Sequence, residues 1–294
     1  MSGFLTVSSE RTGAEVYHEG PWPASRLRLG ILSESASGAM NMALDEAILE
    51  AVLKHGAPPT LRFYAWDPAC LSLGYAQPVN DTDRAALERE GWDLVRRPTG
   101  GKAILHTDEI TYSISAPIDH TFFANGMLPS YKRISLALIA GLERMGMMPE
   151  LHITDPPVPS NGNPVCFHNP SAFEITVEGK KLVGSAQLRR AGGVLQHGSV
   201  PLQGELGRIC LALRYANEDD RERAMGEVGL HAITVERVLG GPITWEEAAR
   251  HLTAGFEDTF QLRFSHQEPS LPEIRRSHEI LEERYLHPDW TQRI

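Results

Sequence analysis

Apolar residues recur every three or four positions in several stretches of the chain, the spacing that gives a helix one hydrophobic face. The clearest stretch runs from Met40 to Val52 and ends before a glycine and a Pro-Pro pair. Asp45 is expected on its polar side. Thr244 and Glu247 have the spacing of a capping box at the start of another helix. Helices are therefore expected over residues 40–52, 80–90, 130–146, 244–260 and 272–285.

Short runs of β-branched and aromatic residues bounded by turn residues predict strands. These runs lie at residues 27–32, 61–66, 70–75, 93–97, 103–106, 110–115, 173–177, 181–187 and 194–200. Two hairpins are expected, one joining 103–106 to 110–115 and one joining 173–177 to 181–187. Strands connected mostly by hairpins and mixed with helices favour an α+β fold, with mixed and antiparallel sheets flanked by helices, over a doubly wound one.

The chain divides into three parts by composition. Residues 1–26 form a polar lead-in, residues 27–240 carry most of the strand and helix signals, and residues 241–294 are expected to form a helical C-terminal extension. The Pro/Asn/Gly-rich stretch 155–170 is expected to be a loop. The extension carries no chemistry of its own, and it is expected to pack on the central part or to help bind a partner.

A net charge of −10 argues against a protein whose main task is to grip nucleic acid or an anionic membrane. The three cysteines lack CxxC or metal-ligand spacing, which is the usage of a reducing compartment. No signal-length apolar segment and no run of about 18 apolar residues occurs, so a cytoplasmic location without a membrane span is expected. The histidines are scattered, and no metal site is expected.

Candidate chemistry centres on one thiol and one glycine pair. Cys166 lies in the Pro/Asn-rich stretch, which favours exposure, whereas Cys70 and Cys210 lie in apolar runs and are expected to be structural. On the residues alone, a buried apolar role stays open for Cys166 as well. Gly100 and Gly101 allow the backbone to approach a ligand closely, although an ordinary hairpin turn explains them equally well. A thiol, a nearby lysine and a Gly-rich loop are the parts of covalent acyl transfer.

Longer motifs carry a family resemblance. Residues 96–106, followed by Thr111-Tyr112-Ser113, resemble the lipoate-attachment superfamily, which includes lipoate–protein ligases, octanoyltransferases and, more distantly, biotin–protein ligases. Residues 41–47 are similar to the first helix of that family, residues 179–187 to its lysine motif, and the match extends through residues 195–199. The resemblance covers roughly residues 27 to 215, and it implies a biotin/lipoate ligase-like catalytic domain over residues 27–240.

Cys166 directs the resemblance to one branch, the octanoyl-acyl-carrier-protein:protein N-octanoyltransferases of the Gram-positive type, which have a nucleophilic cysteine at this place. The ATP-dependent ligases usually lack this thiol. The resemblance implies Lys181 as the cation that lowers the pKa of the thiol, which is about 8.5 in an unperturbed cysteine. A solvated turn lysine is the alternative for Lys181. His168, two residues after Cys166, is a rival activator by the Cys–His pattern.

For substrate binding, the resemblance implies residues from all these motifs: Arg97, Gly100, Gly101, His106, Gly184, Ser185, Ala186, His197 and Gly198. The implied reaction moves an octanoyl group from octanoyl-acyl-carrier protein, through a cysteine thioester, to a lysine of a lipoyl-domain protein such as the glycine cleavage H protein. No cofactor is expected, because thioester exchange needs no ATP. The alternatives are an ATP- and Mg²⁺-dependent lipoate–protein ligase, an amidotransferase acting between lipoyl domains, and a carrier-protein binder without catalysis.

Overall fold

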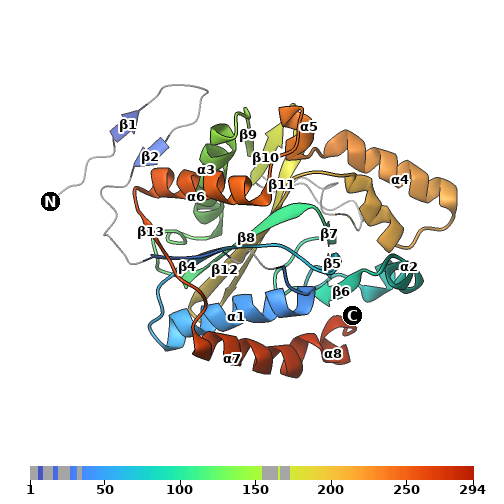
Figure 1. Cartoon of the computed structure of the whole chain (residues 1–294), viewed down its shortest axis with the longest axis horizontal. Coiled ribbons are helices and arrows are strands. Elements are labelled where there is room, and N and C mark those ends of the chain that lie inside the picture. Colours follow the sequence, from blue (N-terminus) through green and yellow to red (C-terminus); the bar gives the residue numbers. More distant parts are fainter. Residues whose placement is uncertain (1–5, 9–15, 19–26, 32–34, 154–164, 166–172) are drawn as a thin grey trace.

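A computed structural model of the protein describes residues 6–8, 16–18, 27–31, 35–153, 165 and 173–294. Its centre is an eight-stranded mixed sheet with helices on both faces (Figure 1). In spatial order the strands are β13 (Phe264–His266), β3 (Leu27–Ile31), β4 (Thr60–Tyr64), β8 (Glu109–Pro117), β12 (Gly193–Pro201), β11 (Lys180–Arg190), β10 (Phe173–Val177) and β9 (Glu150–Ile153). The pairs β13–β3 and β3–β4 are parallel, and the remaining pairs are antiparallel.

A second sheet of three strands lies beside the large one. Its central strand β5 (Cys70–Leu73) pairs in parallel with β6 (Asp93–Arg96) and antiparallel with β7 (Ile104–His106). The Gly100-Gly101 segment connects β6 to β7, so this small sheet positions the loop. The short strands β1 (Thr6–Ser8) and β2 (Val16–His18) pair with each other elsewhere.

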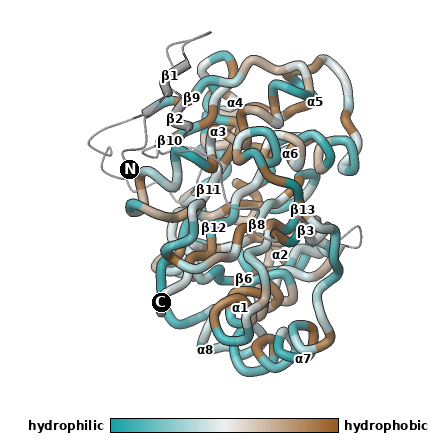
Figure 2. Tube along the Cα trace, turned by 90° about the vertical axis from the view of Figure 1, so that its left-hand side faces the viewer, coloured by the Kyte–Doolittle hydropathy of each residue, from teal (hydrophilic) through white to brown (hydrophobic). Residues whose placement is uncertain are grey.

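Two pairs of helices cover the large sheet. Helices α1 (Gly38–Lys54) and α7 (Leu271–Ile280) lie on one side, and α3 (Met127–Arg144) and α6 (Trp245–Phe260) lie on the other (Figure 1). Along α7, hydrophobic and hydrophilic positions alternate, as in a helix with one buried face (Figure 2). The remaining helical segments are η1 (Val79–Asp81), α2 (Arg84–Glu90), η3 (Leu206–Ala212), α4 (Glu218–His231), α5 (Val235–Leu239), η4 (Leu281–Tyr285) and α8 (Pro288–Thr291).

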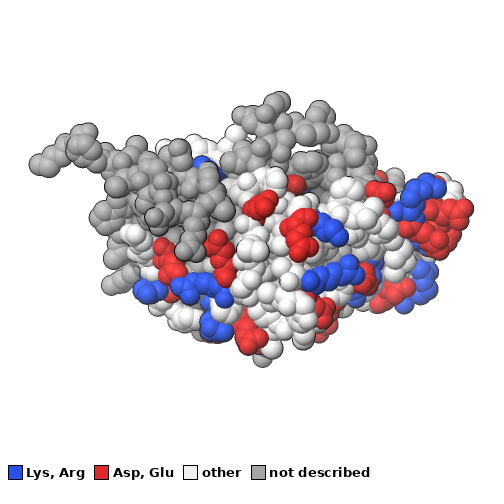
Figure 3. Space-filling view, turned by 90° about the horizontal axis from the view of Figure 1, so that it is seen from above, with Lys and Arg blue, Asp and Glu red and all other residues white. Residues whose placement is uncertain are grey.

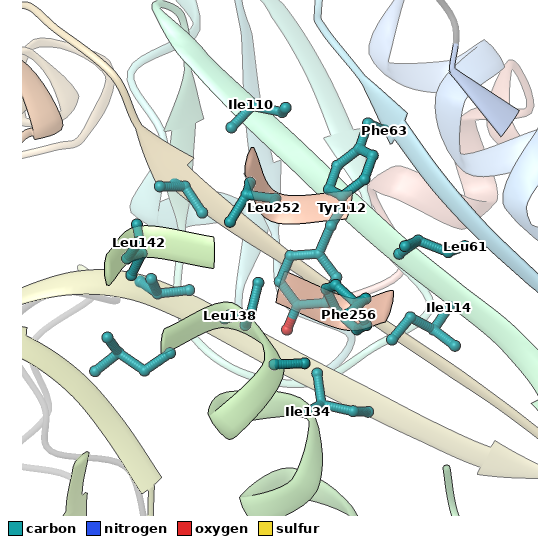
Figure 4. Packing of buried hydrophobic residues seen from close by; sticks show 14 of the residues in the cluster. Leu61, Phe63, Ile110, Tyr112, Ile114, Ile134, Leu138, Leu142, Leu252 and Phe256 are labelled. Atoms are coloured by element: carbon teal, nitrogen blue, oxygen red, sulfur yellow. The ribbon is translucent and has the colours of Figure 1, made fainter. Parts of the chain in front are cut away.

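The main hydrophobic core lies between the sheet and the pair α3 and α6. Tyr112 from β8 and Phe256 from α6 meet Leu138 from α3 in this layer (Figure 4). The two helices cross closely at glycines, since a Cβ at Gly255 would lie 2.3 Å from the backbone nitrogen of Gly141. Because of this close crossing, α3 and α6 pack together as one layer against the large sheet.

The C-terminal segment, residues 241–294, packs directly onto the large sheet. Strand β13 extends the large sheet through its parallel pairing with β3. Glu273 of α7 accepts two hydrogen bonds from the Arg28 guanidinium, at 2.7 and 2.5 Å, and both side chains are buried. Helix α6, also in this segment, contributes Leu252 and Phe256 to the main core. A division of the chain at residue 240 stays a prediction.

Charged side chains of both signs are mixed on the described surface seen from above (Figure 3). No helix in the described parts of the chain is long and apolar enough to cross a lipid bilayer. The described residues also include no cluster of three or more His, Cys, Asp or Glu side chains that could hold a metal ion.

The α+β class with mixed and antiparallel sheets is confirmed. The helix over residues 40–52 is α1, and the capping box of Thr244 and Glu247 opens α6. The hairpin of β10 and β11 is also present. Strands β9 and β13 and the helical segments η3, α4 and α5 were not among the expected elements.

The hairpin expected between residues 103–106 and 110–115 is wrong. Strand β7 pairs with β5 in the small sheet, whereas β8 pairs with β4 and β12 in the large one. The reason is that β12 offers β8 a longer pairing partner than β7 does. The nine residues of β8 pair with β12 from Glu109–Pro201 to Pro117–Gly193, which the three residues of β7 cannot match.

Candidate functional site

A pocket opens where α1, the small sheet and strands β8, β11 and β12 meet. About 390 Å³ of empty space lies between its walls, and part of that space is open to solvent. It is lined by Met42, Tyr64, Trp66, Ser72, Arg97, Gly101, Ile104, His106, Thr111, Gly184, Ser185, Ala186, His197, Gly198 and Ser199. Nearly all of the sequence-based substrate-binding candidates are therefore gathered around one cavity, and among them only Gly100 lies outside this lining.

The exposure of the lining residues distinguishes a mouth from a floor. Gly101 is exposed, and Ser185 and Ala186 are half-buried, so the pocket opens to solvent between them. Met42 and Tyr64, in contrast, are 1% and 0% exposed. The exposed end of the pocket is therefore between the Gly-rich loop and β11, and its buried end is at α1 and β4.

The Gly-rich loop is held against β5 by close backbone contact. A Cβ at Gly74 would lie 1.9 Å from the carbonyl oxygen of Gly101, so only glycine fits there. Gly101 itself has φ of +92°, which side-chain-bearing residues rarely adopt. The Arg97 guanidinium donates to the carbonyl oxygens of Gly100 and Lys102, at 2.8 and 2.7 Å. Arg97 thus shapes the loop that forms one wall of the pocket.

A chain of hydrogen bonds links Arg97 to the large sheet. Arg97 donates to the Ser72 hydroxyl at 3.0 Å, and Ser72 Oγ lies 2.8 Å from Nε2 of His106. His106 Nδ1 lies 2.8 Å from Glu109 Oε1, so one ring nitrogen contacts a hydroxyl and the other contacts a carboxylate. The indole of Trp66 stacks on the His106 ring, with 3.8 Å between the ring centroids. The imidazole is therefore fixed on three sides.

Glu109 is the buried carboxylate at the end of this chain. It also accepts hydrogen bonds from the hydroxyls of Thr111 and Ser199. Burial by itself raises the pKa of Glu109, but His106 and these hydroxyls outweigh it and hold the pKa below its ordinary value. Glu109 is consequently an ionised anchor beneath the pocket.

Asp45 of α1 is a second buried carboxylate beside the pocket. It accepts from Arg62 at 2.7 Å, from Tyr64 at 3.0 Å and from Ser113 at 2.8 Å. Burial raises its pKa, but the Arg62 charge, with His197 and Ser113, brings the pKa below the ordinary value. The expectation that Asp45 lies on the polar side of the helix is wrong, because Arg62 neutralises it inside the protein.

His197 connects this carboxylate to the Gly-rich segment. Its Nδ1 lies 3.7 Å from Asp45 Oδ2, and its Nε2 lies 2.6 Å from the hydroxyl of Thr99. Burial lowers the pKa of His197, although the Asp45 carboxylate opposes that shift. Both histidines that line the pocket are thus engaged with protein groups on both ring nitrogens.

The small residues of β11 and β12 form the opposite wall. Ser185 faces Gly198, and Ala186 faces His197 in the antiparallel register. A Cβ at Gly198 would lie 2.6 Å from both the Tyr112 ring and the carbonyl oxygen of Gly184. The absence of a side chain at Gly198 therefore lets the Tyr112 ring and β11 lie directly against this part of β12.

Lys181 is buried and ion-paired. Its Nζ lies 2.8 Å from Glu174 Oε1, and its side chain is only 6% exposed, so it is not a solvated turn lysine. Its neighbour Lys180 is half-buried, with Nζ 3.4 Å from the carbonyl oxygen of Gly229. The Lys181 side chain is thus held in the interior beside the Glu174 carboxylate.

Cys166 and His168 lie outside the described residues, and their roles stay predictions. Val165, the residue before Cys166 in the sequence, is buried and forms a parallel bridge with Ala103, next to the Gly-rich segment. The other two cysteines, Cys70 and Cys210, are buried, and burial raises the pKa of both thiols. A raised pKa disfavours the thiolate that a nucleophile needs.

Several residues of the site were missed by sequence reasoning: Met42, Asp45, Tyr64, Trp66, Ser72, Ile104, Glu109, Thr111 and Ser199. Two signals were nevertheless present. Asp45 follows Met42 by three positions and thus lies on the same helix face. Arg62 interrupts an otherwise apolar strand, which indicates a buried partner of opposite charge.

Comparison with known sequences gives a consistent set of relatives. The model of the lipoyl protein ligase A/B catalytic domain matches residues 37–257. The octanoyltransferase LipM of Carboxydothermus hydrogenoformans is 38% identical over 262 residues, covering 88% of this chain and 96% of that protein. The proteins of the same name from Brevibacillus brevis and Bacillus subtilis are 35% and 34% identical, covering 90% and 88% of this chain and 98% and 95% of those proteins.

Solved structures with the same fold include lipoate–protein ligases. A bipartite lipoate–protein ligase of Thermoplasma acidophilum superposes with a TM-score of 0.75 at 22% identity, covering 91% of this chain and 96% of that one. Lipoate–protein ligase A in its ATP-bound form superposes with a TM-score of 0.73 at 23% identity, covering 91% and 98%. These likenesses show a shared fold.

Proposed function

This chain belongs to the family of lipoyl protein ligase A/B catalytic domains, and from that premise we propose how it works as an octanoyltransferase of protein lipoylation. The proposed donor is octanoyl-acyl-carrier protein, and the proposed intermediate is an octanoyl thioester of Cys166. The proposed acceptor is a lysine of a lipoyl-domain protein, with the glycine cleavage H protein as the first candidate. The proposed location is the cytoplasm.

The observation that carries the proposal is the pocket itself. Its floor is apolar, and its mouth is formed by small residues of β11 and by the Gly-rich loop. An octanoyl chain gains roughly 0.8 kcal/mol for each methylene that leaves water, so such a floor favours an acyl tail. The tail would point towards α1, and the carbonyl group would stay near the mouth.

The proposed nucleophile belongs at that mouth. Val165 pairs with Ala103 beside the Gly-rich loop, and Cys166 follows Val165 in the sequence. In the first step, the thiolate of Cys166 attacks the thioester carbonyl carbon and forms a new C–S bond. The C–S bond to the carrier breaks, and the carrier leaves as a thiolate that takes a proton from water. Because one thioester replaces another, the step is close to neutral in free energy and needs no ATP.

The second step gives the product. The uncharged amine of the acceptor lysine attacks the acyl-enzyme carbonyl, an amide bond forms, and the Cys166 sulfur leaves as a thiolate after the amine has lost its proton. Amide formation from a thioester is downhill, which drives the transfer forward. The acyl group therefore moves twice between nucleophiles without any change in oxidation state.

Lys181 is the proposed cation that favours the thiolate. A cysteine with an ordinary pKa of about 8.5 is only a few per cent ionised at neutral pH, so a nearby positive charge raises the reactive fraction. The ion pair with Glu174 supports this proposal, since a half-buried carboxylate keeps the ammonium oriented. Glu174 also limits the effect, because it neutralises part of the charge that reaches the thiol.

Intact-mass spectrometry tests the proposal. The protein is incubated with octanoyl-acyl-carrier protein in the absence of ATP, and its mass is measured before and after treatment with neutral hydroxylamine, which cleaves thioesters. A gain of one octanoyl group that hydroxylamine removes is the expected result. Absence of the adduct, combined with acceptor labelling that requires free octanoate and ATP, contradicts the thioester route and supports a ligase.

A further inference from the structure

We infer that Met42 sets the length of the acyl chain that the pocket accepts, an inference that rests on the proposed acyl transfer. Met42 comes from the middle of α1 and is 1% exposed, whereas Gly101, at the mouth, is exposed. The methionine therefore lies at the inner part of the cavity, where the methyl end of a bound acyl chain would stop.

The aromatic neighbours of Met42 are held in place. The Tyr64 hydroxyl donates to Asp45 at 3.0 Å, and the Arg62 guanidinium lies 3.9 Å from the centre of its ring. Trp66 donates from Nε1 to Thr111 at 2.8 Å and stacks on an imidazole. Moving either ring breaks a buried hydrogen bond, so neither gives way to a longer ligand.

Met42 differs from these rings in kind. Its side chain is unbranched, flexible and apolar, the type of residue that adapts its shape to what it touches. Ile104, another lining residue, is β-branched and therefore stiffer, and Ala186 has no rotatable side chain. The length of the cavity thus depends on the atoms of one methionine side chain.

The protein behind Met42 is closely packed. Met42 belongs to a hydrophobic cluster with Ala43, Cys70 and Val95. One helical turn earlier, a Cβ at Gly38 would lie 2.4 Å from Cys70 Sγ, so this part of the helix already touches the small sheet. On this side, the cavity therefore becomes longer when atoms of Met42 itself are removed.

Replacement of Met42 by alanine removes about three atoms of methylene size from the floor. Each additional methylene that becomes buried favours binding about fourfold, which corresponds to roughly 0.8 kcal/mol. With room for two more carbons, Met42→Ala is expected to shift the ratio of decanoyl to octanoyl use by about tenfold or more in favour of decanoyl. Met42→Phe fills the floor and is expected to shift preference from octanoyl towards hexanoyl.

The experiment measures two quantities for acyl chains of six, eight and ten carbons. One is the rate of thioester formation from the acyl-carrier proteins, followed by intact mass. The other is the rise in melting temperature caused by hexanoate, octanoate and decanoate, which needs no chemistry. Met40→Ala is the matched control, because Met40 lies on the same helix but contacts Ser277 of α7 instead of the pocket. It is expected to keep the octanoyl preference.

The outcomes separate this inference from the proposed function. Opposite shifts in Met42→Ala and Met42→Phe, with an unchanged Met40→Ala, support the inference. An unchanged order of chain lengths in both Met42 variants overturns it, even if the octanoyl adduct forms normally. If the wild-type protein forms no adduct at all, the thioester route is wrong. The inference about Met42 is then tested by the melting temperatures alone, from the order in which hexanoate, octanoate and decanoate stabilise each variant. Absence of any length dependence in the wild-type melting temperatures also overturns the inference.

Discussion

At the scale of single residues, the candidate site is built on charges that are buried together with a partner. Asp45 forms a buried ion pair with Arg62, and Glu109 accepts hydrogen bonds from the hydroxyls of Thr111 and Ser199. Removing one member of a buried ion pair typically costs about 3–5 kcal/mol, since the other charge is left without compensation. These carboxylates therefore act as supports of the pocket walls, while the proposed chemistry belongs to the thiol of Cys166.

The first prediction concerns that thiol. Cys166→Ser is expected to abolish the octanoyl adduct, because a serine hydroxyl is a far weaker nucleophile at neutral pH than a thiolate. Cys70→Ser and Cys210→Ser are the matched controls, since both residues are buried free thiols whose pKa is raised. Intact mass after incubation with octanoyl-acyl-carrier protein provides the measurement. An adduct of undiminished size in Cys166→Ser would place the nucleophile elsewhere.

The second prediction concerns the charge of Lys181. Lys181→Met keeps most of the side-chain volume but removes the ammonium, so alkylation of Cys166 by iodoacetamide should slow at neutral pH and its pH midpoint should rise. Lys180→Met is the control, because this neighbour is half-buried and lies near Gly229. If both variants keep the wild-type alkylation profile, Lys181 is not the activator, and His168 becomes the next candidate.

At the scale of elements, the Gly-rich loop and β5 are fitted to each other through glycine. Gly74 leaves no space for a side chain next to Gly101, and Arg97 binds the loop carbonyls from the other side. The loop is thus a closely packed wall of the pocket, and Gly100 and Gly101 are required to different degrees. Gly101 has a backbone conformation that favours glycine, whereas Gly100 has open space around it.

The third prediction uses this difference. Gly101→Ala is expected to destabilise the protein by about 1–3 kcal/mol through backbone strain. Its Cβ would also lie 2.9 Å from Arg97, so the loop should shift and octanoate should bind more weakly. Gly100→Ala is expected to be close to neutral, because no heavy atom lies within 4 Å of its Cβ. Urea unfolding and octanoate titration measure both effects. Equal behaviour of the two variants would argue against a glycine-dependent wall.

At the scale of the whole molecule, the C-terminal segment and the pocket share α1. The helix presents Asp45 to the pocket side and Glu46 to the C-terminal region, where Tyr285 donates to Glu46 at 2.8 Å. Arg276 of α7 donates a hydrogen bond to Glu50 of α1. The helix that forms the pocket floor is therefore held between the sheet and α7.

The fourth prediction is the pH dependence of stability. The pKa of His197 is lowered by burial, so the unfolded chain binds its proton at a higher pH than the native protein does. The free energy of unfolding should therefore be at its full value above about pH 6.5. It should decrease as the pH falls below that value. The lowered pKa values of Asp45 and Glu109 add a further loss below about pH 4.

Urea unfolding at a series of pH values from neutral to acidic measures this slope. His197→Gln should flatten the part of the slope between neutral pH and about pH 5, since glutamine does not titrate. His55→Gln is the control, because His55 is an exposed helix-end residue. A slope that is the same in wild type and His197→Gln would show that other groups cause the acid sensitivity.

The sequence by itself determined most of the local elements and about half of the residues that line the pocket. Some features depend only on residues that are neighbours along the chain, so the sequence predicts them directly. They are the periodicity of α1, the capping box of α6 and the turn between β10 and β11. The family motifs likewise named Arg97, His106 and His197 before their surroundings were known.

Only the tertiary structure decided which elements pair and which polar residues are buried. Strand β7 took β5 as its partner although β8 is closer in sequence, because β8 gains a far longer partner in β12. Asp45 entered the interior because Arg62, seventeen residues later, neutralises it there. Such outcomes follow from competition between contacts distant in sequence, and a local pattern carries no record of which contact wins.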